Sequence, residues 1–227
     1  MVPPVLRWLV YPPPARKPDW AGFAPGWLLE LQRFRGEVLY NNGLRPAFQT
    51  PDGQLSDPNP ADPYAYHIIA RTTDEVVASL RVIPLTCTDQ GFCEQLLGPD
   101  GLRRLMRTIG CSRNQVWEGS GWAVCQSWRN ASIGSQAVAA GFAVAGKLQL
   151  PVAIGASGTR YGQLNHVLTM GYREVPGFGL LPAPTLSDDI RLVYGAFTTL
   201  RPAFRDLVDR VAGQLIYETA SEPSPTG

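Results

Sequence analysis

The chain has 227 residues, of which 44% are hydrophobic, so it is long and apolar enough to bury a full core in one large α/β domain. Its 20 basic and 19 acidic residues leave a net charge of +1, and this balance argues against general electrostatic binding to nucleic acid. The sequence has two histidines and no C-x-x-C pair among its four cysteines, so no metal site is expected.

The cysteines are expected to be reduced thiols of a cytoplasmic protein, and no apolar run in the sequence is long enough to cross a membrane. Residues 1–25 are expected to form an extended arm, because Pro12-Pro13-Pro14 holds the backbone extended. Residues 26–217 are expected to form a single domain. The last segment, residues 218–227, has the composition of a disordered tail.

The first predicted helix runs from about Trp27 to Tyr40, with apolar residues at helical spacing along one face. Arg35 falls inside that apolar stripe. Either its side chain snorkels to the edge of the domain, or its guanidinium binds an anionic partner, because burying an unpaired arginine is costly.

A loop rich in proline, glycine and aspartate follows, from Asn41 to Pro63. It is longer than most structureless connections, and such loops often cover or bind substrates. Two strands come next, Tyr66–Arg71 and Val76–Ile83, and the polar break between them predicts a hairpin. Arg81 lies in the second strand, either on its exposed face or facing a partner.

The rest of the chain alternates helices and strands. The predicted elements are, in order, a helix over Asp89–Ile109 broken at Gly98-Pro99, a strand around Trp117, a helix over Ser132–Lys147, a strand over Leu150–Ala156, a helix over Thr159–Met170, strands over Tyr172–Val175 and Ile190–Tyr194, and a helix over Pro202–Tyr217. This order predicts an α/β or α+β fold with a mixed sheet.

Glu118 is the only carboxylate in the apolar run Val116–Val124. In a buried strand, desolvation would raise the pKa of this carboxylate, which suits a general base that takes a proton from an amine. Alternatively, Glu118 points to solvent or pairs with an arginine such as Arg35 or Arg81.

The segment Arg129–Gln136 follows this strand and opens a predicted helix. A glycine there would let the backbone approach an anion, whose oxygens the exposed N–H groups and the helix dipole would hold. The segment is neither a P-loop nor a dinucleotide-binding fingerprint, because the glycine patterns of both are missing. The alternative interpretation is an ordinary helix start.

Several of these segments occur in the order found in a known superfamily. From about Leu28 to Phe178 the chain resembles the GNAT acyltransferases, and among them the N-acyl-homoserine lactone (autoinducer) synthases and the related N-acyl amino acid synthases. The matching segments are Arg35-Gly36-Glu37-Val38-Leu39 for the family's Arg-x-x-Val-Phe, Asp57 and Asp62 for its paired aspartates, Ser79-Leu80-Arg81-Val82-Ile83-Pro84 for its Ser-x-Arg-Leu-x-Pro, Trp117-Glu118-Gly119-Ser120-Gly121-Trp122-Ala123-Val124 for its Trp-Glu-x-Ser-Arg-Phe-Ala-Val, and Gly171-Tyr172 for the end of a late helix.

The resemblance implies a mixed, splayed sheet of roughly seven strands with helices on both faces. It implies transfer of an acyl group from acyl-carrier protein or acyl-CoA to the amine of a small amino-acid-like acceptor. No bound cofactor is implied, because acyl-CoA or acyl-phosphopantetheine is a co-substrate. Glu118 would be the catalytic base. The implied acceptor-binding residues are Arg35, Asp57, Asp62 and Arg81, and the implied residues for the acyl carrier or CoA are Ala123, Val124, Cys125, Arg129, Asn130, Ile133, Gly134 and Ser135.

Three features depart from the pattern of the synthases. Gly121 replaces an arginine, Leu39 replaces an aromatic residue, and Asp57 and Asp62 are five positions apart instead of three. These departures count against S-adenosylmethionine as the acceptor, and hence against lactone formation, more than against the superfamily. An acetyl-CoA-dependent acetyltransferase and a catalytically silent acyl- or ligand-binding protein of the same fold are the alternatives.

Overall fold

The computed structural model describes residues 5–16, 24–41, 43–129 and 132–218. These residues form a nine-stranded mixed sheet with the strand order β6-β8-β5-β4-β3-β2-β1-β9, and β7 pairs with β8 outside this path. The strands are β1 (Arg7–Tyr11), β2 (Tyr66–Arg71), β3 (Val76–Pro84), β4 (Val116–Val124), β5 (Val152–Gly158), β6 (Arg173–Glu174), β7 (Leu181–Ala183), β8 (Asp188–Ala196) and β9 (Leu215–Tyr217). The helices are α1 (Gly26–Tyr40), α2 (Phe92–Ile109), α3 (Ile133–Lys147), α4 (Gln163–Met170) and α5 (Pro202–Ala212).

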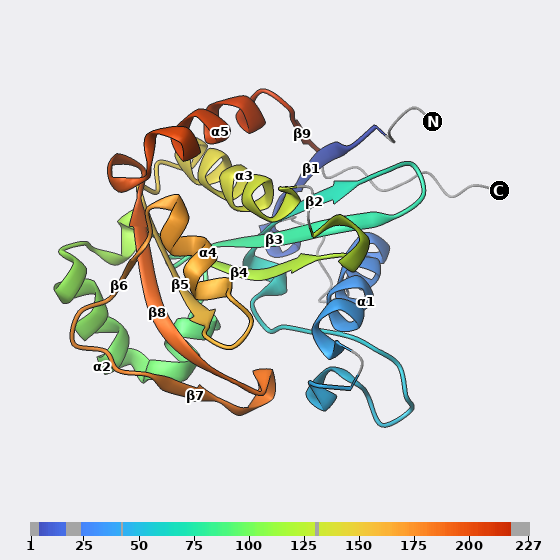
Figure 1. The fold of residues 1–227 in the computed structure, drawn as a ribbon, viewed down its shortest axis with the longest axis horizontal. Helices are drawn as coiled ribbons and strands as arrows, with labels where there is room; N and C mark the ends of the chain where they lie inside the picture. The colour runs from blue at the N-terminus through green and yellow to red at the C-terminus, as the bar shows by residue number, and fades with distance from the viewer. Residues whose placement is uncertain (1–4, 17–23, 42, 130–131, 219–227) are drawn as a thin grey trace.

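Helices cover both faces of the sheet, as the sequence predicts. Figure 1 shows α3 and α5 packed together over one face, with α1 and α2 on the other. Because α3 consists mostly of small and apolar residues, it can be buried over most of its surface. The core on its side contains Trp117, Phe142 and Phe204, whose rings pack edge to face. A second cluster, which includes Leu105 and Ile154, lies under α2.

Both ends of the domain contribute strands that the sequence pattern does not predict. The extended arm predicted over residues 1–25 needs correction, because Arg7–Tyr11 forms β1 and pairs antiparallel with β2. Trp8 and Val10 are buried, so apolar burial holds this segment inside the domain. Residues 1–4 and 17–23 of the predicted arm lie outside the described residues, as do residues 219–227 of the predicted tail.

The last predicted helix is also wrong at its end. The helix α5 stops at Ala212, and after Gly213 the chain extends into β9, which pairs in parallel with β1. Glycine is a poor helix former, and the ladder with β1 gives the backbone of β9 hydrogen-bond partners that a further helical turn would have supplied. The short strand β7 is the third strand that the sequence pattern does not reveal.

The sheet splits between β4 and β5. These two strands run parallel and pair at only three positions, the last of which is Glu118 opposite Ile154. Beyond that point β4 continues to Val124 and β5 to Gly158, with β4 paired only to β3 and β5 only to β8. The predicted splay near Glu118 is therefore confirmed. Backbone groups on the facing edges of the two diverging segments are left for a ligand or water.

Candidate active site

Glu118 lies at the end of the pairing between β4 and β5. Its side chain is buried, with 1% of the residue exposed, and points to the face that α2 covers. Oε1 accepts the N–H of Phe92 at 2.7 Å and Oε2 accepts the N–H of Cys93 at 2.8 Å. These two amides open α2, so the carboxylate caps this helix and meets the positive end of its dipole. Gly91 makes the approach possible, because a Cβ there would lie 2.9 Å from Oε2.

The burial of Glu118 has a clear effect on its acidity. Desolvation raises the pKa of this carboxyl above its ordinary value, although the hydrogen bonds from Cys93 and Phe92 and the charge of Arg81 oppose the rise. Burial and the neighbouring Glu118 charge raise the pKa of the Cys93 thiol well above its usual range. The thiol is therefore protonated at neutral pH and is a poor nucleophile, while Glu118 is a stronger base than an exposed glutamate.

Four charged residues that are distant in the sequence meet on the same face of the sheet: Arg35, Asp57, Asp62 and Arg81. Arg35 donates through Nε to Asp57 at 2.8 Å and through Nη2 to Asp62 at 2.7 Å. Arg81 donates through Nη1 to the other oxygen of Asp62 at 2.9 Å. Gln32 gives Asp62 a further hydrogen bond, also at 2.9 Å. We call these four charged residues the buried ion-pair cluster.

The cluster is electrically balanced, since two guanidinium groups face two carboxylates. Desolvation raises the pKa of Asp62, but Arg81 and Arg35 outweigh it and hold this pKa at about 2. His67 lies beside the cluster, with Nε2 at 2.9 Å from the carbonyl oxygen of Asp62, so Nε2 carries the hydrogen and donates. Burial lowers the pKa of His67 to about 3, which keeps the imidazole neutral.

Two arginine nitrogens of the cluster remain without a partner among the described residues. They are Nη1 of Arg35 and Nε of Arg81, and both are buried. The other guanidinium contacts join α1, the long loop and β3 to one another. The alternative that Arg35 snorkels to the domain edge is therefore wrong, because its side chain is fully buried and paired with carboxylates.

Gly121 sits at a β-bulge in β4. The register between β3 and β4 shifts between Ser79 and Arg81, which face Ala123 and Ser120, so β4 carries one extra residue here. Gly121 has φ +60°, and a Cβ on it would lie 2.7 Å from Nε of Arg81. The Ser79 hydroxyl donates to the carbonyl of Gly121 at 2.9 Å. Glycine therefore fits this position for two reasons, the left-handed backbone and the close approach of Arg81.

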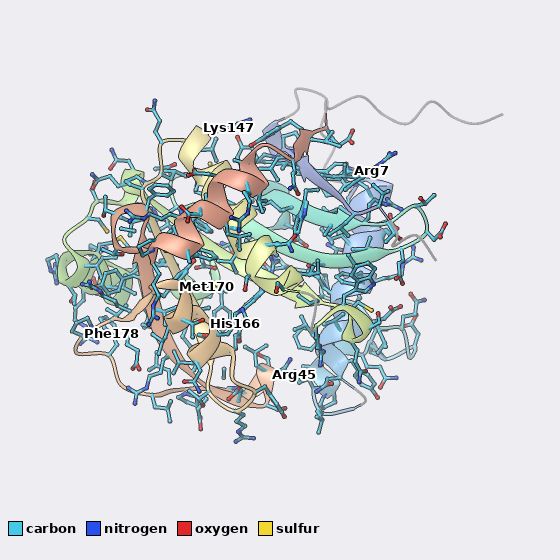
Figure 2. All side chains as sticks on the ribbon, turned by 45° about the horizontal axis from the view of Figure 1, so that its top comes forward. Arg7, Arg45, Lys147, His166, Met170 and Phe178 are labelled. Atoms are coloured by element: carbon cyan, nitrogen blue, oxygen red, sulfur yellow. The ribbon has the colours of Figure 1, made fainter. Side chains whose placement is uncertain are left out.

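The N-terminus of α3 lies on the other face of the sheet. The first helical hydrogen bond runs from the amide of Gln136 to the carbonyl of Ser132, so the amides of 133–135 point out of the helix end. The Trp122 ring packs on Gly134, where a Cβ would meet it at 3.2 Å. The hydroxyl of Ser135 lies 3.0 Å from Nε2 of His166. His166 belongs to α4 and is labelled in Figure 2.

The residues predicted to bind the acyl carrier or CoA differ in burial and in hydrogen bonding. Ile133, Gly134 and Ser135 open α3, and Ala123 is buried in β4. The amide of Cys125 donates to the carbonyl of Val77 at 2.9 Å, so this amide is not free to bind the donor. Arg129 is exposed, and its Nε lies 3.4 Å from the carbonyl oxygen of Val124. Asn130 lies outside the described residues.

Several site residues are visible only in the structure. Gln32 precedes Arg35 by one helical turn, and this spacing is the only sequence signal that could have linked it to the cluster. Nε1 of Trp122 and the hydroxyl of Ser157 are buried without a hydrogen-bond partner among the described residues. They belong to the diverging segments of β4 and β5, so each is an unused polar group beside the splay. No group of three or more His, Cys, Asp or Glu in the described part of the chain could hold a metal ion.

Comparison with known proteins finds solved structures with a similar fold. No protein-family model matches the sequence, and no curated protein matches it. Among solved structures, a CoA-dependent acyl-homoserine lactone synthase, BjaI, with SAM and isopentyl-CoA matches 96% of this chain over 96% of its own, with 15% identity and a TM-score of 0.65. MesI, another CoA-dependent acyl-homoserine lactone synthase, matches 92% of this chain over 98% of its own, with 15% identity and a TM-score of 0.58. The AHL synthase LasI matches 95% of this chain over 98% of its own, with 12% identity and a TM-score of 0.56.

The fold is that of the acyl-homoserine lactone synthases. The GNAT-like fold expected from the ordered motifs is thereby confirmed over almost the whole chain. Among the described residues, no helix of this synthase fold is long and apolar enough to span a membrane.

Proposed function

We propose that this protein is an N-acyltransferase that moves an acyl group from a CoA or acyl-carrier-protein thioester to the amine of a small amino-acid-like acceptor. The observation that carries the proposal is the split of the sheet after Glu118 and Ile154, with a helix N-terminus on one face and a buried carboxylate on the other. A thioester that enters from the α3 side and an amine that enters from the α1 and α2 side would meet between the diverging strands.

The donor half of the proposal rests on α3. Its open amides and the helix dipole suit the phosphate of a CoA or phosphopantetheine arm. The unpartnered Trp122 Nε1 and Ser157 hydroxyl would face the amide groups of that arm as it passes between β4 and β5. Arg129 would meet a phosphate or the acidic surface of a carrier protein. BjaI was solved with isopentyl-CoA, which supports a CoA thioester as one donor.

The acceptor half rests on Glu118. Its raised pKa suits removal of a proton from the amine as the amine attacks the thioester carbonyl. The N–C bond forms as the C–S bond breaks, and the thiol of CoA or of the carrier leaves with a proton. We assign no covalent intermediate to the enzyme, because Cys93, the thiol nearest to Glu118, is held protonated. The carboxylate accepts two backbone N–H groups and a hydrogen bond from the Cys93 thiol. Because a carboxylate has about four lone-pair sites, one is left for the amine or a bridging water.

The buried ion-pair cluster has a supporting part in this proposal. Since Arg35 and Arg81 are neutralised by Asp57 and Asp62, we propose that the cluster shapes the wall of the acceptor site and fixes the loop 57–62 against α1. Direct binding of the acceptor would require the cluster to open. The adjacent cavity of about 330 Å³, lined by Leu28, Gln32 and Asp62 among others, lies on the N-terminal half of α1.

The experiment that tests the proposal compares purified wild-type protein with Glu118→Gln. Each is incubated with short-, medium- and long-chain acyl-CoA and a mixture of amino acids and S-adenosylmethionine, and N-acyl products are measured by mass spectrometry. Glu118→Gln is expected to lower the rate roughly 100-fold or more, while Glu37→Gln, on the exposed face of α1, leaves it unchanged. Near-normal turnover of Glu118→Gln would remove Glu118 from the mechanism.

A catalytically silent acyl-binding protein is the second candidate. The observation that favours it is that both oxygens of Glu118 accept hydrogen bonds from backbone amides of α2, which gives this carboxylate a structural role. In that case the wild-type protein binds an acyl-CoA measurably by calorimetry but releases no CoA thiol in the presence of any acceptor. Release of the thiol that depends on an added amine excludes this candidate.

A further inference from the structure

Arg45 connects the two halves of the molecule beyond the split in the sheet. It follows α1, and its own amide donates to the carbonyl of Tyr40 at 3.2 Å. Its Nε donates to the carbonyl of Leu186 at 2.8 Å, across 141 positions of the sequence. Its guanidinium also lies over the Tyr161 ring, with Cζ at 5.3 Å from the centroid. Figure 2 labels Arg45 between the end of α1 and the segment that leads into β8.

The carbonyl that Arg45 binds belongs to the end of a short 3-10 helix, Pro184–Leu186. Carbonyls at a helix end lack partners within the helix, so the hydrogen bond with Nε satisfies both groups. The guanidinium is then fixed at one edge by this carbonyl and on one face by an aromatic ring, an orientation that cation–π attraction reinforces. Its two Nη groups form no hydrogen bond or ion pair with the residues that the structure describes.

The charge of Arg45 is not neutralised within the described part of the chain. The ion pairs there involve other arginines, and none includes Arg45. Arg35 and Arg81, by contrast, are each held by the carboxylates of Asp57 and Asp62. Arg45 is only partly buried, so it is a preoriented cation with no protein anion and with solvent access.

We infer that Arg45 binds the carboxylate of the acceptor and selects acceptors that carry one. This inference rests on the proposed N-acyltransferase function and names the side chain that recognises the acceptor substrate. Two parallel Nη–H donors match the two oxygens of a carboxylate. Arg45 follows α1, which packs against β3 and β4, and its side chain reaches Tyr161 and Leu186, which adjoin β5 and β8. It therefore bridges the two halves of the sheet that separate after Glu118, and our proposed function places the acceptor between these halves. The phosphates of the donor belong to α3 on the other face.

The test measures kinetics for an amino-acid acceptor and for its carboxamide, which lacks the anionic group. The acceptor is the amino acid or S-adenosylmethionine that gives the most N-acyl product with the wild-type protein. We compare wild type, Arg45→Ala, Arg45→Lys and the control Arg33→Ala, which removes an exposed arginine from α1. Thermal melting of each variant shows that the fold is retained, and Arg45→Lys, which keeps the charge, serves if Arg45→Ala unfolds.

Arg45→Ala is expected to raise the acceptor KM about 10- to 100-fold, in the range of lost hydrogen bonds to a charged group, with a smaller change in kcat. The KM for the carboxamide and for acyl-CoA should stay within about twofold, and Arg45→Lys should lie between wild type and Arg45→Ala. An unchanged acceptor KM overturns the inference. A rise in the KM for acyl-CoA instead assigns Arg45 to a donor phosphate and also overturns it. If the wild-type protein acylates no acceptor, the proposed function itself fails, an outcome distinct from product formation that ignores Arg45.

Discussion

Asp62 offers the sharpest test of the buried ion-pair cluster. Its two oxygens accept three side-chain hydrogen bonds, from Arg35, Arg81 and Gln32, at 2.7, 2.9 and 2.9 Å. Asp62→Asn keeps the size of the side chain but removes its charge and turns one acceptor into a donor that faces other donors. The two guanidinium groups would then share only Asp57, so the cluster changes from neutral to a net charge of +1.

We expect Asp62→Asn to destabilise the protein by about 3–5 kcal/mol at pH 7, the range found when one partner of a buried ion pair is removed. The measurement is equilibrium unfolding in urea, followed by tryptophan fluorescence. The matched control is Asp52→Asn, because Asp52 carries the same charge in the same loop but is exposed. The control should change the free energy of unfolding by less than about 0.5 kcal/mol.

The pH dependence gives the prediction a second, independent readout. The pKa of Asp62 is about 2 in the folded state against 3.8 for the free side chain, so its charge contributes about 2–3 kcal/mol of stability at neutral pH. Because the folded-state pKa is the lower one, this contribution is complete above about pH 4 and is lost as the pH falls toward 2. The stability gap between wild type and Asp62→Asn should therefore narrow over that window. A gap below 1 kcal/mol at pH 7, or one that does not change with pH, would refute the idea that the cluster is a compensated buried network.

Three further predictions concern Glu118, Gly121 and Arg129. The rate of N-acylation should fall as the pH drops through the raised pKa of Glu118, because the base must be ionised. A pH–rate profile in which the rate falls only below the ordinary glutamate pKa of 4.5 would contradict this prediction. Gly121→Ala should destabilise the protein by about 1–2 kcal/mol more than Gly53→Ala in urea titrations. Both glycines have positive φ, but only at Gly121 does a Cβ meet Arg81; equal effects would leave the close contact without importance. Arg129→Glu should raise the KM for acyl-CoA or acyl-carrier protein with no change in melting temperature, and an unaffected donor KM would exclude Arg129 from donor binding.

The sequence by itself determined the features that depend on local pattern. Apolar residues at helical spacing predicted α1, and the mostly apolar segment 150–156 predicted a strand, since each pattern reports which faces are buried. Gly98-Pro99 predicted the break in α2, and Gly98 has non-helical backbone angles there. The ordered motifs predicted a GNAT-like splayed sheet. The position of Arg35 in an apolar stripe left two interpretations, a side chain that snorkels or one with an anionic partner. The structure shows the partner.

Only the tertiary structure decided which groups meet. Nothing in the sequence indicates that the members of the buried ion-pair cluster neutralise one another. Their pairing depends on how α1, the loop 41–63 and β3 pack together. The same holds for Glu118, whose partners are the amides of a helix 25 and 26 positions earlier in the chain.

Strand pairing at the ends of the chain was likewise undetermined by local pattern. The segments of β1 and β9 are short, and each becomes a strand only because a neighbour offers its hydrogen-bonding edge. Arg45 illustrates the same limit in the candidate site. Its sequence neighbours indicate a loop arginine, and its free, oriented guanidinium appears only when the fold brings Leu186 and Tyr161 beside it. Periodicity encodes burial along one element, whereas contacts between distant elements depend on how the whole sheet and its helices pack together.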